Sequence, residues 1–150
     1  MSVIDWQILN DVEAAVTNVS GINTVLTTVC ESKVDIPASG FPAALVLWKK
    51  TVEASSGADS GELSGRVHFV IALVVRDAGS TSALESALTL ADAVRDATLT
   101  DPTRSGLASA TQEGPATELG PAEVLEGRKP PLLEVRLEGS CGYFVSDRGN

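Results

Sequence analysis

The residue types that most often carry out chemistry are few in this chain and widely separated. The single histidine, His68, lies in an apolar run with no second histidine or cysteine nearby, which gives a metal site little support. Cys30 and Cys141 form no C-x-x-C pair, and we expect two buried free thiols. Asp92 and Asp96 lie one helical turn apart, a spacing that suits acid–base chemistry but is more typical of a solvated helix face. The sequence therefore predicts no catalytic residue, no metal and no cofactor.

Phosphate-binding and nucleic-acid-binding patterns are also missing from the sequence. Gly57, Gly61 and Gly65 are spaced by four, which matches neither a phosphate loop nor a dinucleotide fingerprint. The dipeptide at 128–129 is basic but too short for a nucleic-acid footprint. The formal net charge of −9 should repel a phosphate backbone. We expect neither nucleotide binding nor specific binding to DNA, and we expect no enzyme.

Length and composition indicate one globular domain over residues 1–150. The chain has 150 residues, of which 43% are hydrophobic and 21% charged, as in ordinary globular proteins. Its apolar runs are far shorter than the roughly 20 residues of a membrane helix. The first residues show no basic region followed by a long apolar core, so we expect no secretory leader and no membrane association.

Hydrophobic periodicity predicts the order α-β-β-β-α-β-β. A first helix is followed by β-branched strand segments, and an acidic loop of small residues at 53–65 separates two strands that form an antiparallel hairpin. A capping box begins the second helix, and the last strand alternates apolar and polar residues. The fold class is α+β: an antiparallel or mixed sheet of four to five strands with two helices packed on one face. The predicted elements are 3–19, 22–29, 43–52, 66–76, 82–99, 122–126 and 133–143.

The strand at 66–76 is apolar on both faces, although two helices cover only one face of a sheet. The second face must be covered by a loop such as 103–121 or by another subunit, and we favour the subunit. This interpretation predicts a subunit interface at Trp48, Val70 and Val74, with Trp48 otherwise a core residue.

The layout resembles the tail-terminator (tail-completion) proteins of long-tailed bacteriophages. The first helix ends in Ser20-Gly21-Ile22, and Phe41-Pro42-Ala43-Ala44-Leu45-Val46 opens the second strand. A flexible hairpin and the strand leading into Asp77 follow, and then a helix, Asp101-Pro102 and Gly106-Leu107. A late charged strand, Leu133-Glu134-Val135-Arg136-Leu137, completes the resemblance, which covers nearly the whole chain as an order of elements.

The resemblance implies a structural subunit of the virion that is assembled in the host cytoplasm. Such subunits form a ring, typically a hexamer, which caps the tail tube on one side and meets the neck or connector protein on the other. DNA passes through the ring without specific binding, and no cofactor is involved. The alternatives are another head–tail connector, neck or tail-tube subunit, or a small cytoplasmic ligand-binding α+β domain.

Acidic residues in two segments are candidates for the channel of such a ring. Glu134 and Glu138 lie on the polar face of the last predicted strand, and Glu53, Asp59 and Glu62 belong to the hairpin loop. Carboxylates repel DNA phosphates over about 8 Å at physiological salt, so these acids either line the lumen or, in the loop, dock a partner. The alternative is that they only keep the outer surface soluble.

Overall fold

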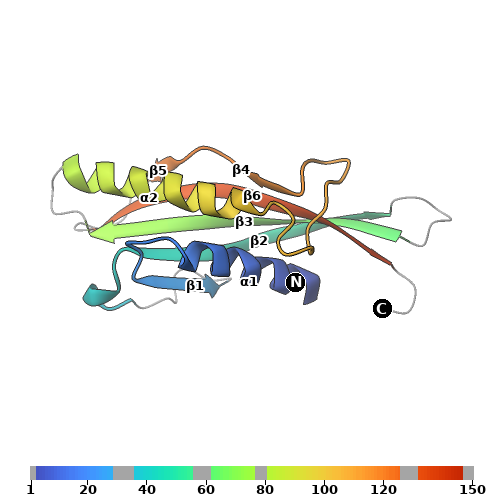
Figure 1. The fold of residues 1–150 in the computed structure, drawn as a ribbon, viewed down its shortest axis with the longest axis horizontal. Coiled ribbons are helices and arrows are strands. Elements are labelled where there is room, and N and C mark those ends of the chain that lie inside the picture. The colour runs from blue at the N-terminus through green and yellow to red at the C-terminus, as the bar shows by residue number, and fades with distance from the viewer. Residues whose placement is uncertain (1–2, 29–35, 56–61, 77–80, 126–131, 147–150) are drawn as a thin grey trace.

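Two α-helices and a six-stranded mixed sheet form the part of the chain that the computed structural model describes: residues 3–28, 36–55, 62–76, 81–125 and 132–146 (Figure 1). The predicted α+β class is confirmed. The strand count exceeds the prediction because one edge of the sheet is divided into two short strands. The elements are α1 (Val3–Thr17), β1 (Thr24–Thr28), the 3-10 turn η2 (Ala38–Gly40), β2 (Ala43–Ser55), β3 (Glu62–Arg76), α2 (Thr81–Thr100), β4 (Thr117–Leu119), β5 (Glu123–Leu125) and β6 (Leu132–Ser146).

The sheet has the order β1-β2-β3-β6-β4, with β5 also paired to β6. Only β1 and β2 are parallel, and every other pair is antiparallel. β4 and β5 follow one another along β6 and are separated by residues 120–122, with Pro121 in the middle. Proline has no N–H to donate to the ladder, so the edge strand is interrupted there.

The predicted hairpin between β2 and β3 is confirmed, but its strands are longer than expected. β2 continues to Ser55 and β3 begins at Glu62, and Glu53 pairs with Gly65. The prediction of a loop over 53–65 is therefore wrong at both ends, because backbone pairing continues through small and polar residues. Residues 56–61, which include Asp59, lie outside the described residues.

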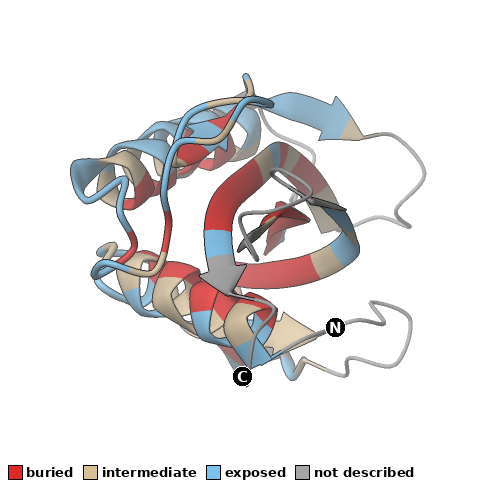
Figure 2. Ribbon diagram, turned by 90° about the vertical axis from the view of Figure 1, so that its right-hand side faces the viewer, coloured by how far each residue is buried: buried red, intermediate tan, exposed pale blue. Residues whose placement is uncertain are grey.

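Both helices lie on the same side of the curled sheet and turn their buried faces toward it (Figure 2). Their apolar residues recur at helical spacing, which places them on one stripe. Full burial of each such aliphatic side chain contributes about 1.5–3 kcal/mol. The stripes of the helices and the facing side of β3 form the main core: Ile8, Leu9, Val12, Val16, Ala87, Ala91, Val94, Val67, Phe69, Ile71 and Leu73.

The second face of the sheet is also buried within the single chain. Val70 and Val74 retain only 4% and 1% of their exposure. The prediction that another subunit must cover these side chains is therefore wrong. A second apolar cluster lies on this face, and Ile36 packs against it from just before η2: Leu45, Leu47, Val70 and Ala72.

The alternative cover for this cluster, the segment 103–121, packs elsewhere. Ala108 and Leu119 belong to the main core on the helix side, and Leu107 packs against that core. Thr111 and Pro115 of the same segment accept hydrogen bonds from Arg66, which lies on the second face. It therefore wraps around the sheet edge rather than lying under the apolar cluster.

A β-bulge between Trp48 and Lys50 changes which side chains of β2 face the helices. Trp48 pairs with Phe69, so it lies on the helix-covered face, and its predicted grouping with Val70 and Val74 is wrong. Beyond the bulge, Thr51 takes over the helix-facing position. The extra residue reverses the alternation of the strand, and no apolar pattern signals it.

Thr51, which the bulge turns toward the helices, connects β2 to α1 through hydrogen bonds. Trp48 Nε1 donates to Thr51 Oγ1 (3.2 Å), and Thr51 Oγ1 donates to Asp5 Oδ2 (2.7 Å). Asp5 lies in the first turn of α1 and is almost fully buried. A carboxylate is favourable there because the helix N-terminus carries partial positive charge.

Candidate functional site

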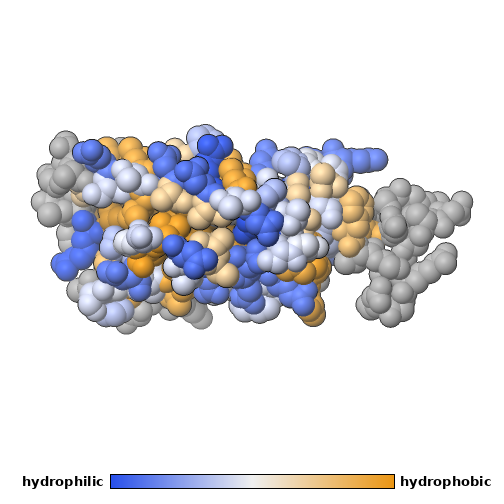
Figure 3. Space-filling model, viewed as in Figure 1, coloured by the Kyte–Doolittle hydropathy of each residue, from blue (hydrophilic) through white to orange (hydrophobic). Residues whose placement is uncertain are grey.

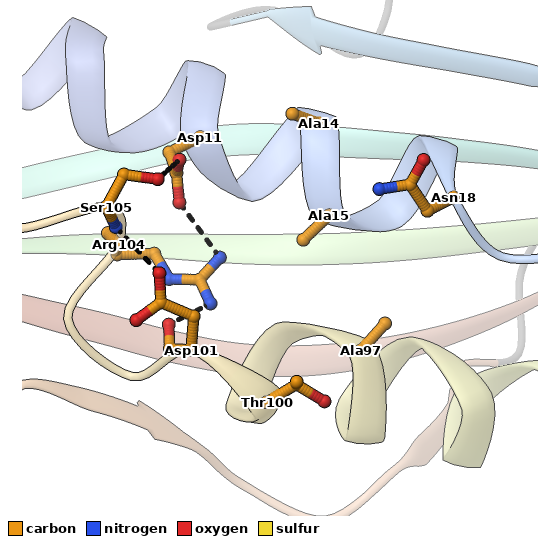
Figure 4. A pocket seen from close by; sticks show the side chains of 9 residues that line it. All are labelled: Asp11, Ala14, Ala15, Asn18, Ala97, Thr100, Asp101, Arg104 and Ser105. Carbon is orange, nitrogen blue, oxygen red and sulfur yellow. Dashed lines mark hydrogen bonds and ion pairs between the residues drawn. The ribbon is translucent and has the colours of Figure 1, made fainter.

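Polar side chains gather in two pockets, one between the helices and one on the second face of the sheet. The first pocket has a volume of about 440 Å³. It lies where α1 passes the end of α2, and alanines on both helices leave the space (Figure 4). The guanidinium of Arg104 points into the gap between the helices (Figure 4). The lining residues are Asp11, Ala14, Ala15, Asn18, Ala97, Thr100, Asp101, Arg104 and Ser105.

A tight turn after α2 brings Arg104 to this position. Arg104 and Ser105 have φ angles of 49° and 57°, in the left-handed region that non-glycine residues seldom adopt. Asp101 holds the turn, because it accepts hydrogen bonds from the amides of Thr103 (3.1 Å) and Ser105 (2.9 Å) and from the Thr103 hydroxyl (2.6 Å). The Thr103 hydroxyl, followed by the Ser105 amide, lowers the pKa of Asp101.

Arg104 links the end of α2 to α1. Its Nη2 donates to the carbonyls of Thr98 and Asp101, and its Nη1 lies 3.3 Å from Asp11 Oδ2. Ser105 Oγ donates to the other oxygen of Asp11 (2.8 Å). A cation at a helix C-terminus satisfies carbonyls that have no helical partner. Because acceptors on both helices and on the turn hold its guanidinium, Arg104 ties the end of α2 to α1.

The second pocket has a volume of about 240 Å³ and is lined by residues of β2, β3, β4 and β6 and of the segment that precedes β4. Side chains alternate along β3, so Arg66 and His68 share the face of Val70, away from the main core. A neighbouring hollow of about 270 Å³ shares three of its residues and continues toward Glu138. The pocket is lined by Val52, Ser64, Gly65, Arg66, His68, Glu113, Glu118 and Ser140.

Arg66 holds three separate segments together at the floor of this pocket. Its Nη1 donates to Ser140 Oγ (3.0 Å), and its Nη2 donates to Thr111 Oγ1 (3.1 Å) and to the Pro115 carbonyl (2.7 Å). The side chain is 4% exposed. Gly142 permits this approach, because a Cβ there would lie 2.6 Å from the Ser109 carbonyl oxygen and 2.8 Å from Arg66 Nη2.

His68 borders the same pocket as a neutral imidazole. Burial lowers the pKa of His68, and the nearby cations Lys50 and Arg66 lower it further, while Glu118 acts in the opposite direction. Since the ordinary value is 6.5, the ring is uncharged at neutral pH. No group of three or more metal-ligating side chains occurs in the described residues.

The cysteine that the structure describes, Cys141, is a core residue. It is fully buried next to Thr117 Oγ1 (3.3 Å), and burial raises the pKa of its thiol above the usual 9.0. A protonated, buried thiol is a poor nucleophile. The prediction of a buried thiol is confirmed for Cys141, and Cys30 lies outside the described part of the chain.

Of the acids predicted to line a channel, the structure describes the side chains of Glu53, Glu134 and Glu138, and it places Glu53 on a different face of the sheet from the other two. Glu134 is 2% exposed and pairs with Arg136, so its assignment to a solvent-facing polar face is wrong. Glu138 is exposed on the same face of β6. Glu53 is exposed on the opposite face of the sheet. It pairs with Gly65, which lies on the same face of β3 as the helix-facing Val67 and Phe69. The side chain of Glu62 is not among those described.

Arg66 and Arg104 are the two residues that sequence reasoning missed. Arg66 comes directly before the apolar run that begins at Val67, a position at which sequence rules place a charged side chain at the surface. Arg104 follows a proline turn with no pattern that marks it. Both are defined by partners that are distant in sequence, such as Ser140 for Arg66.

The chain matches no protein-family model, and no curated protein matches it. In the described ranges, no helix has both the length and the apolar character to span a membrane.

Proposed function

We propose that the protein is a non-enzymatic structural subunit that forms a ring at the end of a bacteriophage tail tube, where it joins the tube to the neck. The observation that carries this proposal is the pair of sheet edges, β1 on one side and β4 with β5 on the other, whose outer sides no described strand pairs with. The long strands that extend beyond the helices and the strongly acidic charge give further support.

The two edges of the sheet suit head-to-tail association. β1 forms one edge and β4 with β5 forms the other, and no described strand pairs with the outer side of either. Leu26 on β1 and Val124 on β5 are 38% and 43% exposed. Unpaired edges are templates for strand pairing between chains. Joining unlike edges is a heterologous contact, and such contacts generate closed rings when the rotation closes.

The extension of the sheet provides a second contact surface. The ends of β2, β3 and β6 form an arm that continues past both helices (Figure 1). Val52 and Phe144 lie on one face of this arm and are 49% and 46% exposed. Exposed apolar side chains at such a position favour docking against a neighbouring protein.

The helix-bearing face supplies a third apolar region. Hydrophobic side chains gather in the left part of this face, over and beside α2, and hydrophilic side chains interrupt them (Figure 3). Leu84 and Leu88, one turn apart on α2, are each 38% exposed. The net charge of −9 fits a ring through which DNA slides without binding.

Native mass combined with electron microscopy tests this proposal. We expect the purified 15.5 kDa chain to form closed rings of about six copies. Leu26→Lys and Val124→Lys place a charge at each edge and should leave folded monomers, since edge lysines block strand pairing. Val3→Lys is the matched control, because Val3 is 75% exposed on α1, outside the sheet, and rings should persist. A strict monomer at every concentration, or edge variants that still form rings, contradicts the proposal.

A further inference from the structure

One row of apolar side chains crosses the whole sheet and ends at both of its edges. The three inner members of the row belong to the main core. At the β5 edge the row ends on Val124, which is 43% exposed. From one edge to the other, each member pairs with the next in the order Val25, Ala44, Leu73, Val135 and Val124.

The register places β1 and β5 at the same level of the sheet. The three rows that pass through β5 reach residues 24–26 of β1 at the other edge. The rows that pass through β4 cross β2 at residues 48–51 instead, past Leu47, the last residue that pairs with β1. A second copy set beside the first without a shift along the strands therefore brings its β1 to β5 and not to β4.

Strand direction and side-chain phase also suit this contact. Because β1 is parallel to β2 and the other pairs are antiparallel, β1 runs antiparallel to β5. Val25 and Val124 both lie on the helix-covered face, since their partners Ala44 and Val135 are core residues there. A slip by one residue would turn these side chains to opposite faces. A copy in the same orientation continues the sheet with its helices on the same side.

Two further apolar side chains face the edge formed by β4 and β5. Arg95 of α2 donates a hydrogen bond to the Leu119 carbonyl of β4 (3.3 Å), so this stripe of the helix is turned toward the edge. Leu88 and Leu84 lie seven and eleven positions before Arg95, which places them on the same stripe. In a second copy, α1 packs on β1 and would come to lie beside α2 of the first copy. That helix would cover the two leucines.

We propose that β1 of a second copy pairs antiparallel with β5 of the first, with Val25 opposite Val124. The inference rests on the proposed ring and names the strands and side chains that join its subunits. β1 carries no charged side chain, so the contact buries no unpaired charge from that strand.

The rival register is shifted by two residues and places Thr27 opposite Val124. It keeps the faces but breaks the apolar row, and it displaces each copy by about 7 Å along the strands. Where the strands run along the ring axis, such a displacement adds up from copy to copy and gives an open helix instead of a ring.

Cysteine cross-linking tests the register. Val25→Cys and Val124→Cys are made as separate proteins, each also carrying Cys30→Ser, and are mixed with a short thiol-specific cross-linker that spans the about 4.5–5.5 Å between opposite Cβ atoms. We expect covalent dimers from the mixture and none from either protein alone. Glu123→Cys replaces Val124→Cys in the matched control, because Glu123 lies on the other face of β5, and this mixture should give several times less dimer.

The other outcomes are separable when native mass is measured on the same samples. Dimers from Val124→Cys alone would reveal a two-fold contact and overturn the proposal, and a higher yield from Thr27→Cys with Val124→Cys would establish the shifted register instead. Rings without cross-links would overturn this contact but leave the proposed function standing. Cross-links in open filaments would support the contact and contradict the ring, and monomers without cross-links would overturn both.

Discussion

Replacement of Asp11 by alanine should isolate the buried charge of Arg104. Removing one partner of a buried ion pair costs about 3–5 kcal/mol. Asp11 is 21% exposed and Arg104 keeps two carbonyl acceptors, so about 2–3 kcal/mol is the appropriate share. The lost hydrogen bond from Ser105 adds about 1 kcal/mol, and the better helix propensity of alanine returns about 0.5 kcal/mol. The net loss of about 3 kcal/mol is a large part of a typical 5–15 kcal/mol stability.

Urea denaturation followed by circular dichroism measures this loss as a lower transition midpoint. Asp92→Ala is the matched control, because Asp92 is exposed on α2 and gains the same helix propensity without leaving a buried partner. Its free energy of unfolding should stay within about 0.5 kcal/mol of the native value. The double variant Asp11→Ala/Arg104→Met should recover much of the loss, since no buried charge remains. An Asp11→Ala protein as stable as the Asp92→Ala control would refute the reasoning.

Two further predictions concern the sheet. A Cβ at Gly65 would lie 2.3 Å from the ring of the buried Tyr143, so Gly65→Ala should destabilise the fold by about 1–3 kcal/mol in the same urea assay. Gly120→Ala, whose nearest contact is 3.6 Å, should change stability little, and equal losses would count against a steric cause. Because the folded chain lowers the pKa of His68 below 6.5, the unfolded chain binds the proton more readily, and stability should fall as pH drops from above 6.5 through the lowered value. Urea midpoints at several pH values measure this slope, which should be smaller in His68→Gln; an unchanged slope would exclude His68 as its source.

Periodic patterns predicted the fold class, the hairpin and both helices, because long amphipathic segments record which side faces the core. They did not predict the bulge at Lys49, since a single inserted residue leaves the apolar content of a strand unchanged. The alternation of inward and outward side chains that begins at Ala43 therefore predicts the wrong face for the residues after Trp48. Glu53 and the strand ends were assigned to a loop for another reason: the segment is acidic and rich in small residues, a composition typical of loops, but its backbone still pairs.

The candidate site was predicted less well than the fold. Sequence rules place charged residues at the surface, so they give no warning of a buried Arg66, Arg104 or Glu134. Arg66 and Ser140 are 74 positions apart, and only the register of β3 with β6 brings them together. The absence of recognisable motifs limited the search for catalysis, but it carried no information about a pocket built from single polar residues.

The length of β3 gives the arm a mechanical property. Fifteen residues of strand span about 50 Å, whereas the twenty residues of α2 span about 30 Å, so a substantial part of β3 extends past the helical cover. β3 lies in the middle of that arm, with hydrogen-bonded ladders to β2 and β6 on its two sides. A load applied at the tip along the strands therefore shears many hydrogen bonds together instead of opening them one at a time. The arm can transmit tension from a docked neighbour directly into the buried core.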